Sequence, residues 1–204
     1  MFSNKKLSLF RWVLGLLFLM SCQPRVLKKL DKQSPIEEIS VEGLANFNTN
    51  KEAHYRAKVE AFDQKISGQL ILKNQDTNYR AVMITDFGLK VMDLTIFANG
   101  DYQVNHIMKH MDYQFVKHSM ALNILMLLPQ QFNMEAEAYS SGQELLIYAP
   151  QIHSIYYLEE DNLQKVERYR GKNKLWASAE RLGVDRIQII QKNPDIAISL
   201  KTIE

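Results

Sequence analysis

Two long stretches of this 204-residue chain alternate between apolar and polar side chains, and a helical pattern separates them. Between residues 54 and 62, for example, Tyr55, Ala57 and Val59 alternate with polar or charged neighbours. A period of two places the apolar side chains on one face of a β-strand and the polar ones on the other. The chain is therefore constrained to a mainly β, antiparallel fold with a buried face.

Turn residues divide the two stretches into about eleven strands. Asn99-Gly100 is typical of a hairpin turn, and Glu159-Glu160-Asp161 reads as a solvated acidic turn. The segments 77–85 and 89–97 are apolar on both faces, which predicts that both faces are covered. The predicted strands span residues 54–62, 65–73, 77–85, 89–97, 101–107, 144–149, 153–158, 163–170, 175–182, 185–191 and 196–203.

A helix is predicted between the fifth and sixth strands, at about residues 112–128. Its second half, Met120 to Leu128, is apolar nearly all round, with Asn123 as the polar exception. A helix of this kind is buried or lies against lipid. We expect a curved sheet with this helix over its mouth, enclosing an apolar space that is either packed solid or able to hold a lipid.

The N-terminal segment has the layout of a secretory signal. Lys5, Lys6 and Arg11 precede the uncharged apolar run 12–20, which is too short and wrongly flanked for a membrane-spanning helix. A small residue, Ser21, stands before the one cysteine of the chain, Cys22. An ordinary signal peptide with an incidental cysteine is the alternative reading.

The run Leu19-Met20-Ser21-Cys22 resembles the lipobox of bacterial lipoproteins. The resemblance implies that residues 1–21 are a signal peptide and that Cys22 becomes the lipidated first residue, which anchors the protein in a membrane. It predicts a polar tether over residues 22–45 and a folded domain over 46–204. Because Gln23, not aspartate, follows the cysteine, analogy favours the periplasmic face of the outer membrane of a Gram-negative bacterium.

The charge balance argues against a nucleic-acid partner. Three of the 25 basic residues and none of the 23 acidic ones lie in the signal segment, which leaves 22 basic against 23 acidic side chains in the mature chain. A nucleic-acid surface needs clustered Lys and Arg on one face. With Cys22 as the sole cysteine, the mature domain has no disulfide and depends on its hydrophobic core.

The layout of strands, helix and lipobox resembles the LolA/LolB family of Gram-negative bacteria over residues 53–203. The resemblance implies an incomplete, half β-barrel of about eleven antiparallel strands with a helical lid over an apolar cavity. The ligand implied is the acyl chain of a lipoprotein or lipid, and a periplasmic carrier protein is the partner that such a receptor implies. Transfer would need only a difference in affinity between two cavities.

Residues on the predicted helix and on the strands it covers are the candidates for the cavity lining. Methionine adapts to irregular apolar ligands, and Met108, Met111 and Met134 add to a cluster around the helix. A methionine-filled core is the alternative. The predicted lining consists of Met83, Met92, Leu94, Ile96, Met120, Leu122, Leu125 and Met126.

The turn Thr85-Asp86-Phe87-Gly88 resembles the turn at which the family presents an exposed hydrophobic side chain before a glycine. The resemblance implies that Phe87 is a tip for transfer or membrane insertion. Burial of Phe87 in the core is the alternative, because a phenylalanine at a hairpin tip is costly to leave in water.

Motifs for catalysis, metal binding or cofactors are not found in the sequence. His106 and His110 are four residues apart, but no third ligand accompanies them. No nucleophile elbow and no glycine-rich phosphate loop is present. The sequence predicts a non-catalytic lipid-binding lipoprotein, with two rivals: an envelope assembly lipoprotein with a packed barrel, or a carrier of another hydrophobic cargo.

Overall fold

The computed structural model describes residues 24–33, 39–97, 99–132, 136–141, 144–171 and 173–203. The predicted signal peptide, Cys22 and Met134 lie outside these residues. Among the described residues, α2 (Gln114–Leu125) is the α-helix, and three short 3-10 helices are η1 (Arg25–Lys29), η2 (Lys109–Met111) and η3 (Pro150–Ile152). The strands are β1 Asp31–Lys32, β2 Ile39–Val41, β3 Glu52–Ala61, β4 Gln64–Asn74, β5 Asn78–Thr85, β6 Lys90–Phe97, β7 Tyr102–Ile107, β8 Gln130–Phe132, β9 Glu137–Ser141, β10 Glu144–Ala149, β11 Ser154–Glu159, β12 Asn162–Arg170, β13 Lys174–Arg181, β14 Arg186–Gln191 and β15 Ile196–Thr202.

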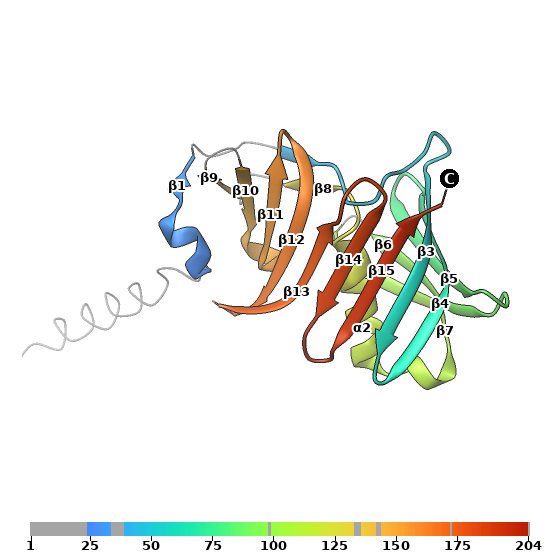
Figure 1. Ribbon diagram of the computed structural model, residues 1–204. Coiled ribbons are helices and arrows are strands. Elements are labelled where there is room, and N and C mark those ends of the chain that lie inside the picture. The colour runs from blue at the N-terminus through green and yellow to red at the C-terminus, as the bar shows by residue number, and fades with distance from the viewer. Residues whose placement is uncertain are drawn as a thin grey trace, which may run out of the picture.

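Thirteen strands form one antiparallel sheet in the order β1-β9-β10-β11-β12-β13-β14-β15-β3-β4-β5-β6-β7. The sheet is open, because β1 and β7 are its two edges and do not pair with each other. In Figure 1 it curls, so that β10 to β12 and β3 to β7 stand on opposite sides with β14 and β15 between them. All eleven predicted strands are present, and the predicted mainly β, incomplete barrel with one helix is confirmed.

The alternation that defined the strands also defines the core. Along β3, Ala53, Tyr55, Ala57 and Val59 are buried, while the residues between them are half-buried or exposed. Buried side chains from β3 to β6, from α2 and from β10 to β15 belong to one hydrophobic cluster. The concave face of the sheet and the helix therefore share a single core.

The helix lies where it was predicted but is shorter than the predicted range of about 112–128. Gln114–Leu125 is helical, and Leu127 and Leu128 follow it as fully buried turn residues. Of the two alternatives for its apolar second half, burial or contact with lipid, the structure shows burial, with Leu122 partly buried. No helix within the described ranges is long and apolar enough to cross a membrane.

Part of the segment predicted as a tether is folded. Leu27 is 1% exposed and packs with Tyr139, Leu146, Tyr148 and Ile155. The strand β1 pairs with β9, β2 pairs with β8, and Val41 and Leu44 belong to the main core. The prediction of a polar tether over residues 22–45 is thus wrong for these residues, because two- and three-residue strands are too short to show a periodicity in sequence.

The outer face of β5, β6 and β7 carries a polar network. Arg80 on this face is exposed and Val82 and Ile84 are half-buried, so the prediction that both faces of β5 and β6 are covered is wrong. Asp93 is 1% exposed and accepts hydrogen bonds from Arg80 Nε and Nη2 at 2.9 and 2.7 Å. Lys90 Nζ and Asn105 Nδ2 donate to the same carboxylate, each at 3.2 Å. Hydrogen bonding to Arg80 holds the pKa of Asp93 well below its usual range.

We expect Asp93→Ala to lower the free energy of unfolding by roughly 1.5–3 kcal/mol near neutral pH, because it removes charge-assisted hydrogen bonds. A carboxylate whose pKa is lower in the folded state stabilises the fold above its unfolded pKa of about 3.9, and that stability is lost as the pH falls further. Urea unfolding at several pH values should therefore show the two proteins converging in acid. Asp185→Ala, which removes an exposed carboxylate with ion-pair distances of 3.8 and 3.7 Å, is the control. A pH-independent gap between wild type and Asp93→Ala would contradict the prediction.

Candidate functional site

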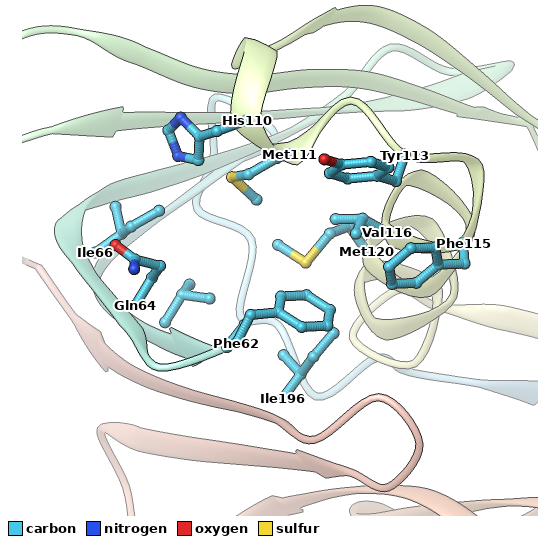
Figure 2. Close-up of a pocket in the computed structure, with 12 residues that line it drawn as sticks. Phe62, Gln64, Ile66, His110, Met111, Tyr113, Phe115, Val116, Met120 and Ile196 are labelled. Carbon is cyan, nitrogen blue, oxygen red and sulfur yellow. The ribbon is translucent and has the colours of Figure 1, made fainter.

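An apolar cavity of about 260 Å³ lies between the β3–β4 hairpin and the first half of α2. Figure 2 shows its side chains converging on this space from the hairpin, from η2 and from α2. Asp, Glu, Lys and Arg are absent from the lining, and Gln64, His110 and Tyr113 supply its polar groups. The lining consists of Val59, Ala61, Phe62, Gln64, Ile66, His110, Met111, Tyr113, Phe115, Val116, Met120 and Ile196.

Backbone periodicity directs these side chains into the cavity. Val59 and Ala61 are two residues apart on β3, and Ile66 pairs directly with Val59 across β4, so all three are on the concave face. Val116 and Met120 are four residues apart on α2 and so lie on the same face of the helix. The cavity is therefore bounded by one face of the sheet and one face of the helix.

Three aromatic side chains surround the cavity at its solvent side. The rings of Phe62 and Phe115 meet edge to face with centroids 5.7 Å apart, and Tyr113 stacks on Phe115 at 5.8 Å. Each of the three is about half exposed, at 48% for Phe62, 50% for Phe115 and 58% for Tyr113. The contact between Phe62 and Phe115 joins the β3–β4 turn to α2.

Phe62 holds an unfavourable backbone conformation at this position. It and Asp63 form the two-residue turn between β3 and β4, with φ angles of 51° and 60°. Asn and Gly are preferred in such turns, and a bulky residue in the left-handed region is strained. Phe62 is thus held in a strained backbone conformation, and its side chain lies at the mouth of the cavity. Backbone strain of this kind is frequent at functional sites.

Most of the predicted lining residues lie in the packed core, not along the cavity. Of the eight, Met120 lines the cavity of about 260 Å³. Leu122 is partly buried and lines a second cavity, beside β12. The remaining six have exposed fractions of 7% or less and belong to the main hydrophobic cluster, namely Met83, Met92, Leu94, Ile96, Leu125 and Met126.

Sequence reasoning did not assign Phe62, Ile66 or Phe115 to a site. The periodicity identified Ile66 as inward-facing, but it could not show that space is left in front of this residue. Met111, a member of the methionine cluster, lines the cavity, whereas Met108 packs against the core. The sequence signal that could have identified the mouth of the cavity is an aromatic residue in a tight turn, as at Phe62.

Phe87 is the most exposed large apolar side chain among the described residues, at 92%. Its turn is fixed by backbone hydrogen bonds between Thr85 and Leu89 at 2.8 Å and between Gly88 and Thr85 at 2.9 Å, and by an ion pair between Asp86 and Arg56. The alternative of core burial is therefore wrong for Phe87. A rigid turn presents the ring to solvent.

The histidines considered as metal ligands do not form a common site. His106 Nε2 lies 3.1 Å from the carbonyl oxygen of Lys90, and His110 lines the apolar cavity. Within the described part of the chain, no group of three His, Cys, Asp or Glu residues could hold a metal ion.

Comparison with known proteins gives matches to solved structures. No protein-family model matches the chain, and no curated protein does. A LolA superfamily protein from Nitrosomonas europaea is 8% identical with a TM-score of 0.46, over 78% of this chain and 86% of that one. A domain assigned to outer membrane lipoprotein sorting, from Vibrio parahaemolyticus, is 8% identical with a TM-score of 0.41 and the same coverage. A DUF1329 family protein from Desulfovibrio piger is 8% identical with a TM-score of 0.41, over 77% and 85%. These neighbours include the family that the sequence layout resembles.

We expect Phe62→Asn to relax the β3–β4 turn and to loosen α2. Asparagine tolerates the left-handed conformation, so the turn itself gains stability, while the aromatic contact with Phe115, worth about 1 kcal/mol, is lost. Hydrogen exchange read by mass spectrometry should show faster exchange in residues 114–120 and unchanged exchange in β12 and β13. Phe97→Asn, which replaces a 38% exposed aromatic outside the cavity, is the matched control. Unchanged exchange in α2 would contradict the role given to this contact.

Proposed function

We propose that this protein is a non-catalytic lipoprotein that binds an acyl chain, of a lipid or of another lipoprotein, in the cavity under α2. The observation that carries the proposal is the cavity itself: about 260 Å³ without a charged residue in its lining. Such a site excludes charged ligands, because their desolvation would be uncompensated. It suits a chain of methylene groups, each of which contributes about 0.8 kcal/mol on burial.

The size of the cavity limits what it holds in this conformation. A cavity of about 150 Å³ holds benzene, so 260 Å³ accommodates on the order of ten carbon atoms. The value is also slightly below the roughly 300–1,000 Å³ of typical small-molecule sites. A full-length acyl chain therefore requires α2 to move away from the sheet.

The packing of α2 supports its role as a movable lid. The amide of Asn123 is fully buried, and neither of its polar atoms has a hydrogen-bond partner among the described residues. An unsatisfied buried polar group costs about 1–3 kcal/mol, which lowers the free energy needed to displace the helix. Ser119 Oγ accepts a hydrogen bond at 3.2 Å from Gln191 Nε2 of β14, so one polar contact holds the closed position.

Two features fit the transfer of cargo at a membrane. Phe87 presents an apolar ring on a rigid turn, and insertion of this ring into a bilayer would remove it from water. Lipidation of Cys22 would tether the domain to the membrane, in our proposal at the periplasmic face of the outer membrane. A periplasmic carrier would deliver the cargo, and transfer would follow the higher affinity.

A second candidate function is that of an envelope assembly lipoprotein. The observation that favours it is the filled interior at β5 and β6, where Met83, Met92 and Leu94 are at most 1% exposed. A protein of this kind would dock a partner through its outer face and would bind no acyl chain. Binding of an acyl chain by the purified protein separates the two functions.

We expect Ile66→Trp to lower the affinity for an acyl chain at least tenfold, because the larger side chain fills the cavity. The measurement is native mass spectrometry of residues 23–204, purified without harsh detergent, followed by titration with a fluorescent fatty acid. Ser67→Trp is the matched control, because the adjacent side chain is exposed and lines a groove on the outer face. Wild-type protein that carries no lipid and ignores added fatty acid would favour the assembly function. Equal binding by Ile66→Trp would place the ligand elsewhere.

We expect Phe87→Glu to slow transfer of a bound acyl cargo to lipid vesicles by about tenfold or more, while cargo binding and thermal stability stay unchanged. A charged side chain at the tip would have to be desolvated on insertion. Val184→Glu is the control, since Val184 is 90% exposed on a different hairpin turn. Vesicle transfer followed by fluorescence dequenching gives the rate. A similar loss in both variants would mean that general charge repulsion, and not the tip, is responsible.

A further inference from the structure

A buried arginine without an acidic partner lies on the opposite side of α2 from the acyl cavity. Arg168 of β12 is 5% exposed, and its Nε donates a hydrogen bond to Ser154 Oγ at 3.2 Å. Its Nη1 is buried and has no hydrogen-bond partner, and no carboxylate within the described ranges forms an ion pair with it. Burial lowers the pKa of the Arg168 guanidinium.

An arrangement of this kind is costly for a folded protein. Buried charges are normally paired, because the loss of hydration is large and only an opposite charge compensates for it. Asp93 shows the usual solution in this same chain, with Arg80, Lys90 and Asn105 around its carboxylate. A buried guanidinium without an acidic partner therefore requires an explanation. A bound ligand group that supplies the negative charge would be a direct explanation.

Arg168 lines a cavity of about 240 Å³, here named the Arg168 pocket, that is open to solvent. Two exposed histidines, His118 of α2 and His153 after η3, also line it, together with Arg170 of β12. The lining contains no Asp or Glu. The pocket therefore has a guanidinium at its base and further hydrogen-bond donors at its sides.

The local backbone builds this pocket. The pairing of β12 with β13 shifts register between Arg168 and Tyr169, so Trp176 is an extra residue on β13. Bulges of this kind redirect side chains and are frequent beside functional sites. Trp176 donates from Nε1 to the carbonyl oxygen of Asn193 at 3.3 Å, and the Arg170 guanidinium lies over its ring at 4.9 Å. Arg170 is thereby held at the rim, and no ion pair occupies it in the described part of the chain.

We propose that the Arg168 pocket binds a small oxyanion of the phosphate or carboxylate type. Guanidinium groups bind such anions through paired, charge-assisted hydrogen bonds. Arg168 lines the pocket, and its hydrogen-bonding capacity is only partly used, since Nη1 has no partner among the described residues. The ligand group comes from a lipid headgroup or from a free anion, since the chemistry of recognition is shared. This site goes beyond the proposed acyl-chain function and does not depend on it.

The position of the pocket links anion binding to the helix. His118 and Leu122 line the Arg168 pocket, whereas Val116 and Met120 line the acyl cavity. Two residues along an α-helix correspond to a rotation of about 200°, so the two cavities lie on opposite faces of α2. An anion bound between β12 and His118 would fasten the helix to the sheet.

The test is a titration of the purified full chain with inorganic phosphate, followed by thermal unfolding and calorimetry, with sodium chloride at equal ionic strength as the blank. We expect phosphate to raise the Tm of the wild type and to slow hydrogen exchange in α2. Arg168→Met should weaken phosphate binding at least tenfold, because a charge-assisted hydrogen bond is lost. Its own Tm without phosphate should equal or exceed that of the wild type, since an unpaired buried charge is replaced by an apolar side chain.

Arg186→Gln is the matched control, because it removes an exposed arginine on β14 that does not line the pocket. It should bind phosphate as the wild type does. If Arg168→Met does not fold, Arg170→Gln tests the same site from its exposed rim and should weaken binding. Competition by a short-chain phosphatidic acid indicates a lipid headgroup, and phosphate binding without such competition indicates a free anion. The proposal is overturned if phosphate leaves the wild type unchanged, or if both pocket variants bind phosphate like the wild type.

Discussion

The pairing of β15 with β3 is the contact on which the rest of the structure depends. These strands are separated by most of the domain in sequence, yet seven residue pairs join them, from Ile196 opposite Ala61 to Thr202 opposite Tyr55. The pairing merges the five-stranded meander β3 to β7, before α2, and the strands β9 to β15, after it, into one curved sheet. The acyl cavity lies at one end of this seam, where Ala61 and Ile196 both line it. Without the seam, the concave face would lose the curvature that creates the cavity.

The helix α2 is a shared wall between two sites of opposite character. The face with Val116 and Met120 closes an apolar cavity, and the face with His118 and Leu122 borders the Arg168 pocket. Its interior carries polar groups that a purely structural helix would avoid, above all the unpaired amide of Asn123. This combination is consistent with a helix whose closed position is only moderately favoured and which ligands on either face could bias.

Asp93 and Arg168, two of the buried charged residues in the described part of the chain, differ in how their charges are compensated. Asp93 is surrounded by donors, and hydrogen bonding to Arg80 keeps its pKa low, so it stabilises the outer face of β5 to β7. Arg168 donates a hydrogen bond to Ser154 Oγ, and it lines a solvent-open cavity. Nothing in the residue types distinguishes these cases, because burial and the partners of each charge are properties of the assembled sheet.

By itself, the sequence determined the eleven main strands, the place of the helix and the inward face of β3 and β4, because a period of two and a period of about 3.6 are local properties of the backbone. It did not determine which face of β5 and β6 is inward, because both strands are apolar on both faces in sequence. It also singled out Phe87, whose exposure the structure established. Tertiary structure decided where the cavity lies. Leu94 and Ile96 are as apolar as Ile66, yet they are fully packed in the core, whereas Ile66 lines the cavity. Tertiary structure likewise brought Arg168, His118 and His153 together and folded Leu27 against the sheet. Volume, burial and charge pairing arise only from contacts between residues that are distant in the chain, and no local pattern encodes them.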